Sequence, residues 1–90
     1  MMTNNNKPLL IFPCNYSLKV MGKVNKNFKK DMTLIVKKHV PEIVEQAVSS
    51  RISNSGNFIS LTFDFKASSK VQLDALYQEL TAHPAVLMAL

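Results

Sequence analysis

The stretch from Asn15 to Gly22 constrains the fold of this chain more than any other. It alternates apolar with polar side chains, which predicts a strand with one buried face and one exposed face. A glycine ends the alternation, and a lysine-rich segment with helical spacing follows at once. A strand that leads directly into a basic helix is typical of the first half of a small α+β domain.

Two segments have apolar residues at the helical period. The first begins near Asn25 or Asn27 and must end about Val40, because Pro41 disfavours helical geometry in the residue before it. The second begins after Ser69, which opens a capping-box pattern, and the dipeptide at residues 83–84 ends it.

Three further strands are predicted, at residues 43–53, 58–66 and 85–90, and Gly56 closes a hairpin between the first two of them. In the last strand we expect Val86, Met88 and Leu90 to share one face. The order strand, helix, strand, strand, helix, strand predicts a split βαβ or ferredoxin-like fold. It has two helices on one face of a four-stranded antiparallel sheet.

Ninety residues make one domain. We expect residues 1–14 to form a flexible N-terminal arm and residues 15–90 the folded domain. A domain of this size buries only about two-thirds of its unfolded surface, so dimerisation through a sheet edge would add stability.

The chain has one cysteine, Cys14, which cannot form an internal disulfide and fits a reducing compartment. The apolar run at residues 9–12 is too short for a signal peptide or a membrane span. The sequence therefore predicts a cytoplasmic protein that is not inserted in a membrane.

Positive charge is concentrated in the first half of the chain. The formal net charge is +5, and up to Lys38 eight lysines oppose a single acidic residue. Such asymmetry has a simple interpretation, a solvated helix face, and a functional one, contact with an acidic protein, nucleic acid or anionic metabolite. Lys29, Lys30 and Lys37 of the first helix are the candidate partner-binding residues under the functional interpretation.

The sequence argues against RNA recognition and catalysis. The exposed sheet positions lack the aromatic residues on which bases stack, so we do not expect nucleic acid as a partner. Gly22, Lys23 and Val24 resemble the phosphate loop of acylphosphatases, but the inner glycine is missing and a lysine replaces the required arginine. Cys14, His39 and His83 are isolated, so we expect no metal, cofactor or catalytic site.

The turn from the first strand into the first helix is a candidate ligand site. A helix start presents backbone donors that suit a carboxylate or phosphate, and Lys23 and Lys26 would add positive charge. Gly22 either permits close approach of a ligand or simply ends the strand with a positive φ.

Several motifs together resemble the YbeD-like family of small bacterial proteins of unknown function. They are Phe12-Pro13-Cys14, Tyr16 with Lys19-Val20-Met21-Gly22, Arg51 to Ser53 with Gly56-Asn57-Phe58, Leu76-Tyr77 with Glu79-Leu80, and Val86 to Leu90. The resemblance implies an ACT-like fold, no catalysis and a regulatory role in lipoate metabolism. By the same analogy an effector would bind at Met21, Gly22, Lys23 and Val24, while Lys19, Arg51 and Asn57 would contact a partner.

Two functions follow from these observations. The first is a non-catalytic ACT-like regulatory module that binds a small anionic metabolite or a partner protein. The alternative is an adaptor whose lysine-rich first helix binds an acidic protein or nucleic acid.

Overall fold

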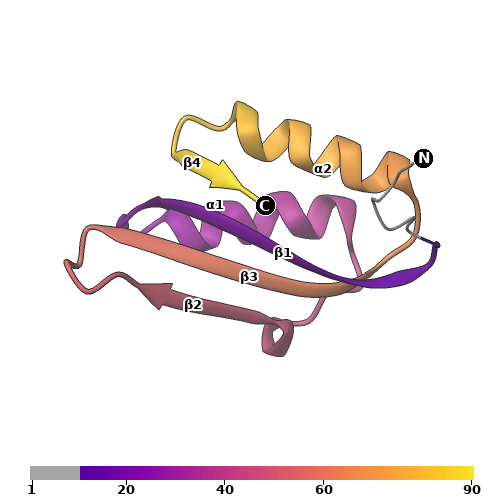
Figure 1. Ribbon diagram of the computed structural model, residues 1–90, viewed down its shortest axis with the longest axis horizontal. Helices are drawn as coiled ribbons and strands as arrows, with labels where there is room; N and C mark the ends of the chain where they lie inside the picture. Colours follow the sequence, from indigo (N-terminus) through magenta and orange to yellow (C-terminus); the bar gives the residue numbers. More distant parts are fainter. Residues whose placement is uncertain (1–10) are drawn as a thin grey trace, which may run out of the picture.

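The computed structural model describes residues 11–90, in which four strands and two helices follow in the predicted order (Figure 1). The elements are β1 (Cys14–Lys23), α1 (Phe28–His39), the short 3-10 helix η1 (Glu45–Ala47), β2 (Val48–Ile52), β3 (Phe58–Ala67), α2 (Lys70–Ala82) and β4 (Val86–Ala89). The sheet order is β2-β3-β1-β4, and every neighbouring pair is antiparallel. The predicted ferredoxin-like fold is confirmed.

Both helices cover one face of the sheet, where the core lies (Figure 1). The fully buried side chains come from the two central strands and from the apolar stripes of both helices: Leu18, Val20, Leu61, Phe63, Phe28, Met32, Val36, Leu76 and Leu80. The predicted alternation along β1 and β3 therefore gives each strand one buried face, because every second residue lies beneath the helices. Among residues 11–90, no helix covers the other face of the sheet, which we call the open face.

Strand register aligns the side chains of the open face in rows. One row runs across all four strands through Arg51, Ser60, Met21 and Met88. In the next row Lys19 lies opposite Thr62, and its backbone exchanges two hydrogen bonds with the last residue of the chain, of 3.0 and 2.8 Å. A basic residue on edge strand β2 and sulfur-containing side chains on β1 and β4 thus share one surface.

The second strand is shorter than predicted. Residues 43–47 were expected to be extended, but only Val48–Ile52 pairs with β3. The chain first forms a turn in which Ile43 N donates to Val40 O at 3.1 Å, and η1 follows. Ile43 is buried, so the segment descends into the core before it reaches the sheet, which is incompatible with a continuous edge strand.

The prediction that Val86, Met88 and Leu90 share one face of β4 is wrong. A bulge separates Val86, which lies opposite Gly22, from Met88, which lies opposite Met21. Because a bulge inserts one extra residue, the alternation shifts across it. Val86 and Ala89 pack against the core, while Leu87 and Met88 are exposed.

Gly22 contributes to packing. Gly56 has a positive φ of 78°, whereas Gly22 does not have a positive φ. The interpretation of Gly22 as a positive-φ strand end is therefore wrong. A Cβ at Gly22 would overlap the carbonyl oxygen of Ala85 and the ring of Phe28, so the missing side chain makes room for the buried start of α1.

The C-terminal end of α1 is fastened to α2 by polar contacts. His39 Nε2 lies 2.7 Å from Glu79 Oε1, and Lys38 Nζ donates to Glu79 Oε2 at 3.0 Å. Gln72 Nε2 donates to the carbonyl oxygen of His39 at 2.9 Å, and its backbone N–H is capped by Ser69 Oγ at 3.0 Å. The capping residues predicted for α2 therefore also join the two helices.

The predicted N-terminal arm, residues 1–14, lies mostly outside the described residues. In its described part, Phe12 and Cys14 pack against the core, and Cys14 is the first residue of β1. Neither helix within residues 11–90 has the length and apolar content needed to cross a membrane.

We expect Glu79→Gln to flatten the acid side of the stability curve. Hydrogen bonds from His39 and then Lys38 hold the pKa of Glu79 below its usual 4.5. Because the folded pKa lies below the unfolded one, the contribution of Glu79 is complete above about pH 4.5 and disappears as the pH falls through the folded pKa.

Urea unfolding midpoints from about pH 7 down to about pH 3 would measure this effect. Wild type and Glu79→Gln should differ most at neutral pH and converge in acid. Asp74→Asn, which removes an exposed pair with Lys70, should change the curve much less. If the unfolding midpoints of wild type and Glu79→Gln changed in parallel with pH, the lowered pKa of Glu79 would not be the source of this pH dependence.

Candidate functional site

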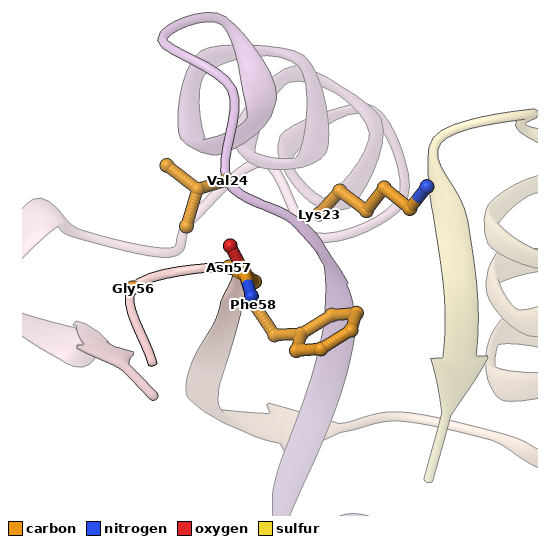
Figure 2. Close-up of a pocket in the computed structure, with 5 residues that line it drawn as sticks. All are labelled: Lys23, Val24, Gly56, Asn57 and Phe58. Atoms are coloured by element: carbon orange, nitrogen blue, oxygen red, sulfur yellow. The ribbon is translucent and has the colours of Figure 1, made fainter. Parts of the chain in front are cut away.

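The loop after β1 meets the β2–β3 hairpin at one end of the sheet. A hollow of about 540 Å³ lies there, lined by Lys23 and Val24 from the loop and by Gly56, Asn57 and Phe58 from the hairpin (Figure 2). Val24 N donates to the carbonyl oxygen of Asn57 at 2.9 Å, which fastens the two segments together. We call this space the loop hollow.

A second, smaller hollow of about 220 Å³ lies on the open sheet face and is lined by Met21, Arg51, Ser53, Phe58, Ile59 and Ser60. We call it the sheet hollow. Phe58 lines both hollows, and its side chain is 45% exposed. In Figure 2 the ring of Phe58 lies across β1, below the amide of Asn57. The two hollows are therefore neighbours that share an aromatic wall.

The charge of this site is positive. Lys23 lies beside the loop hollow and Arg51 beside the sheet hollow, and neither forms an ion pair within residues 11–90. In Figure 2 the Lys23 side chain extends toward β4 and Val24 extends to the opposite side. Lys23 is exposed at a strand end, so its four-carbon stem can turn toward an anion in the loop hollow.

Two backbone donors beside the start of α1 are paired within the turn. Asn27 N donates to Asn25 Oδ1 at 2.8 Å, and Phe28 N donates to the carbonyl oxygen of Asn25 at 3.0 Å. Asn27 is the N-cap by position but makes no side-chain capping bond. Asn27 N and Phe28 N are therefore already paired with Asn25, and an anion site at the helix start stays a prediction.

The structure brings together Met21, Lys23, Val24, Arg51 and Asn57, which all line one of the two hollows. Gly22, the remaining ligand candidate, is buried on the core side of β1 between them. Ligand and partner candidates therefore adjoin at one end of the sheet.

The other partner candidates lie elsewhere. Lys19 is in the middle of the open face, opposite Thr62. Lys29, Lys30 and Lys37 line a separate hollow on the outer side of α1. The six proposed partner residues therefore belong to two surfaces, one on the sheet and one on a helix.

Phe58 is the site residue that sequence reasoning missed. The sequence places Phe58 at the start of a strand and within a family motif, and neither observation marks it as a candidate site residue. It nevertheless shares the polar face of that strand with Ser60, Thr62, Asp64 and Lys66. An aromatic residue on an otherwise polar face was the available signal.

Titratable chemistry at the two hollows is limited. Among the described residues, Tyr77 and Glu79 are the groups with clearly shifted pKa values. Both belong to α2 and line neither hollow. Burial raises the pKa of Tyr77, and its hydroxyl lies 2.8 Å from that of Tyr16. Within residues 11–90, no three His, Cys, Asp or Glu side chains gather closely enough to hold a metal ion.

The strand order and the two helices on one face of the sheet define a small domain with a ferredoxin-like, ACT-like fold. The chain belongs to the family described as "Protein of unknown function (DUF493)", whose model matches residues 7–90. A UPF0250 protein of Chromobacterium violaceum is 39% identical over 89 residues, covering 99% of this chain and 100% of the relative. Another, from Nitrosomonas europaea, is 39% identical over 82 residues, covering 91% and 94%. The resemblance to the YbeD-like family is confirmed.

Two solved structures share the fold. The solution structure of protein HP0495 from Helicobacter pylori has a TM-score of 0.73 at 15% identity and covers 100% of this chain and 94% of its own. The C-terminal domain of the MgtC protein from Mycobacterium tuberculosis has a TM-score of 0.63 at 15% identity, with coverages of 91% and 89%. At these identities the likeness establishes the architecture and leaves the function to the site.

Proposed function

We propose that this chain is a non-catalytic, ACT-like regulatory module that binds a small anionic metabolite at the joined loop and sheet hollows. The carrying observation is that Lys23 and Arg51, from different strands, flank two hollows separated by the ring of Phe58. Ligand sites are typically concave and mostly apolar, with a few polar groups that fix orientation. The sheet hollow has a mainly apolar lining with Arg51 beside it, whereas the lining of the loop hollow is mixed. The cations Lys23 and Arg51 favour a negative ligand.

The residues at the site favour a ligand with an anionic group and an apolar part. The guanidinium of Arg51 presents a planar fork of donors that matches a carboxylate or phosphate. The thioether of Met21 and the ring of Phe58 line the same sheet hollow and offer apolar surface. An anionic metabolite with a short hydrocarbon or aromatic portion would use both kinds of contact.

We further propose that the module acts in the cytoplasm, in the setting of lipoate metabolism that its family resemblance implies. Both hollows are open to solvent on the single chain. A homodimer formed through a sheet edge would place a second copy near them and enclose a ligand further, as effectors of ACT domains are enclosed at subunit interfaces.

Thermal unfolding against a panel of amino acids, lipoate, octanoate and acyl phosphates tests this proposal. A ligand that binds only the folded chain stabilises it by about 2.7 kcal/mol at 100 times its Kd. We expect a saturable rise in Tm for one class of anion, and we expect Lys23→Ala or Arg51→Ala to reduce or abolish it.

Lys66→Ala is the matched control, because Lys66 lies on the same open face but lines neither hollow. It removes the same charge and should leave the rise intact. A specific anion site at these hollows would be refuted if no compound of the panel raised the Tm. It would also be refuted if Lys66→Ala reduced the rise in Tm as much as Arg51→Ala does.

A second function, that of an adaptor, is favoured by one observation. Lys29, Lys30 and Lys37 line a hollow around Leu34, a large apolar side chain that is 60% exposed. Charge reversal of these three lysines should abolish capture of an acidic partner and leave the ligand response of the sheet end unchanged.

A further inference from the structure

The outer side of α1 and the segment that precedes β2 enclose a hollow of about 560 Å³. Among the described residues, its lining consists of four lysines, one threonine, one leucine and one glutamate: Lys26, Lys29, Lys30, Lys37, Thr33, Leu34 and Glu45. It lies on the helical side of the molecule, and it shares no lining residue with the loop hollow or the sheet hollow. We call it the α1 hollow.

The lysines of the α1 hollow lack acidic partners. Lys26, Lys29, Lys30 and Lys37 form no ion pair within residues 11–90, whereas the neighbouring Lys38 is paired with Glu79. Four ammonium groups and one carboxylate line the same space, so like charges repel one another there. Such a surface is stabilised by any ligand that brings negative charge to it.

An apolar side chain lies among these charges. Leu34 follows Lys30 by one helical turn and precedes Lys37 by one turn, so the three side chains are neighbours on the helix surface. The buried residues of α1, Phe28, Met32 and Val36, occupy the opposite side. Leu34 thus offers an exposed apolar contact beside a cluster of ammonium groups, and protein interfaces combine apolar and ionic contacts of this kind.

Three features favour a protein partner over a nucleic acid. In the described part of the chain, no aromatic residue on which a base could stack lines the α1 hollow. Leu34 can neither donate to a phosphate nor read the polar edge of a base. The carboxylate of Glu45 repels any anion beside it, but a peptide can place a backbone N–H there, whereas every nucleotide of a nucleic acid carries a phosphate.

We propose that the α1 hollow docks an acidic protein segment that places one large apolar side chain against Leu34 and carboxylates against Lys29, Lys30 and Lys37. This inference rests on the adaptor function described above and identifies the chemistry of its partner. It is independent of the anion site at the sheet end, so each can fail without the other.

Selection of a random dodecapeptide phage library on the purified full-length chain tests the proposal. The K29E/K30E/K37E variant, present in solution as a competitor, removes phage that bind other surfaces. We expect the enriched peptides to carry several Asp or Glu residues flanking one Leu, Ile, Met or Phe. A synthetic peptide of the enriched sequence is then titrated into each variant by calorimetry.

The affinity for that peptide should fall by about tenfold or more in two variants, K29E/K30E/K37E and Leu34→Ser. The first reverses the charges that attract the carboxylates, and the second truncates the apolar contact. K19E/K23E/R51E changes the net charge by the same amount on the open sheet face, and it should alter the affinity by no more than about twofold. Leu34 is exposed, so Leu34→Ser should keep the wild-type Tm.

Three outcomes would overturn the proposal. Enriched peptides could lack an apolar residue or bind Leu34→Ser as well as wild type, which would mean that binding depends on charge alone. The two triple variants could weaken the peptide equally. A single-stranded oligonucleotide of the same charge could bind more tightly than the peptide and depend on Lys29, Lys30 and Lys37, which would make the partner a nucleic acid.

Discussion

Gly22→Ala should lower the free energy of unfolding by about 2–3 kcal/mol, because overpacking a filled core is strongly unfavourable. A Cβ at this position would overlap the carbonyl oxygen of Ala85 and the Cε1 atom of Phe28, and it would lie 2.8 Å from Phe28 Cζ. The first is backbone next to β4, and the second belongs to a ring that is fully buried. Neither can yield without a shift of β4 or α1, so urea unfolding should show a clear loss of stability.

Two further variants separate steric overlap from other causes. Phe28→Leu replaces the ring by a shorter side chain, so Gly22→Ala should lose less stability in that background than in the wild type. A double-mutant cycle measures this non-additivity. Gly56→Ala is the control for backbone conformation, because Gly56 has φ of 78° and open space around its Cα. It should lose about 1–2 kcal/mol with no dependence on Phe28. A Gly22→Ala variant as stable as wild type would refute the packing of α1 against β1.

The parts of the fold that the sequence predicts are those determined by local pattern. The alternation of β1 and β3 and the apolar stripes of both helices each require only that one face be buried, and the structure buries those faces. The bulge in β4 was beyond such reasoning. Strict alternation placed Met88 with Val86, but the register of β4 depends on how it pairs with β1, a contact between distant parts of the chain.

The site was predicted in part for a similar reason. The loop at Lys23 and Val24 follows from topology alone, and Arg51 and Asn57 came from motifs. Their meeting depends on the antiparallel register that sets Lys23 opposite Phe58 and Arg51 opposite Ser60. Sequence patterns identify such residues one at a time, and only the folded sheet shows that they border neighbouring hollows.

Phe63→Ala should lower the free energy of unfolding by about 3–5 kcal/mol, whereas Phe58→Ala on the same strand should change it by less than about 1 kcal/mol. Phe63 is fully buried among the helices, and its removal leaves a cavity in the centre of the core. A domain of this size has a total stability of about 5–15 kcal/mol, so Phe63→Ala could leave much of the chain unfolded near body temperature. Phe58 lies on the opposite face and is about half exposed.

The same pair of variants separates the fold from the function. Phe58→Ala removes the wall shared by the loop hollow and the sheet hollow, so a ligand that raises the Tm of wild type should have a much smaller effect on this variant. Thermal unfolding with and without that ligand measures both quantities in one experiment. If Phe58→Ala kept the full ligand response, the anion would bind away from these hollows. If it lost as much stability as Phe63→Ala, Phe58 would be a structural residue, and the proposed part of the open face in ligand binding would lose its support.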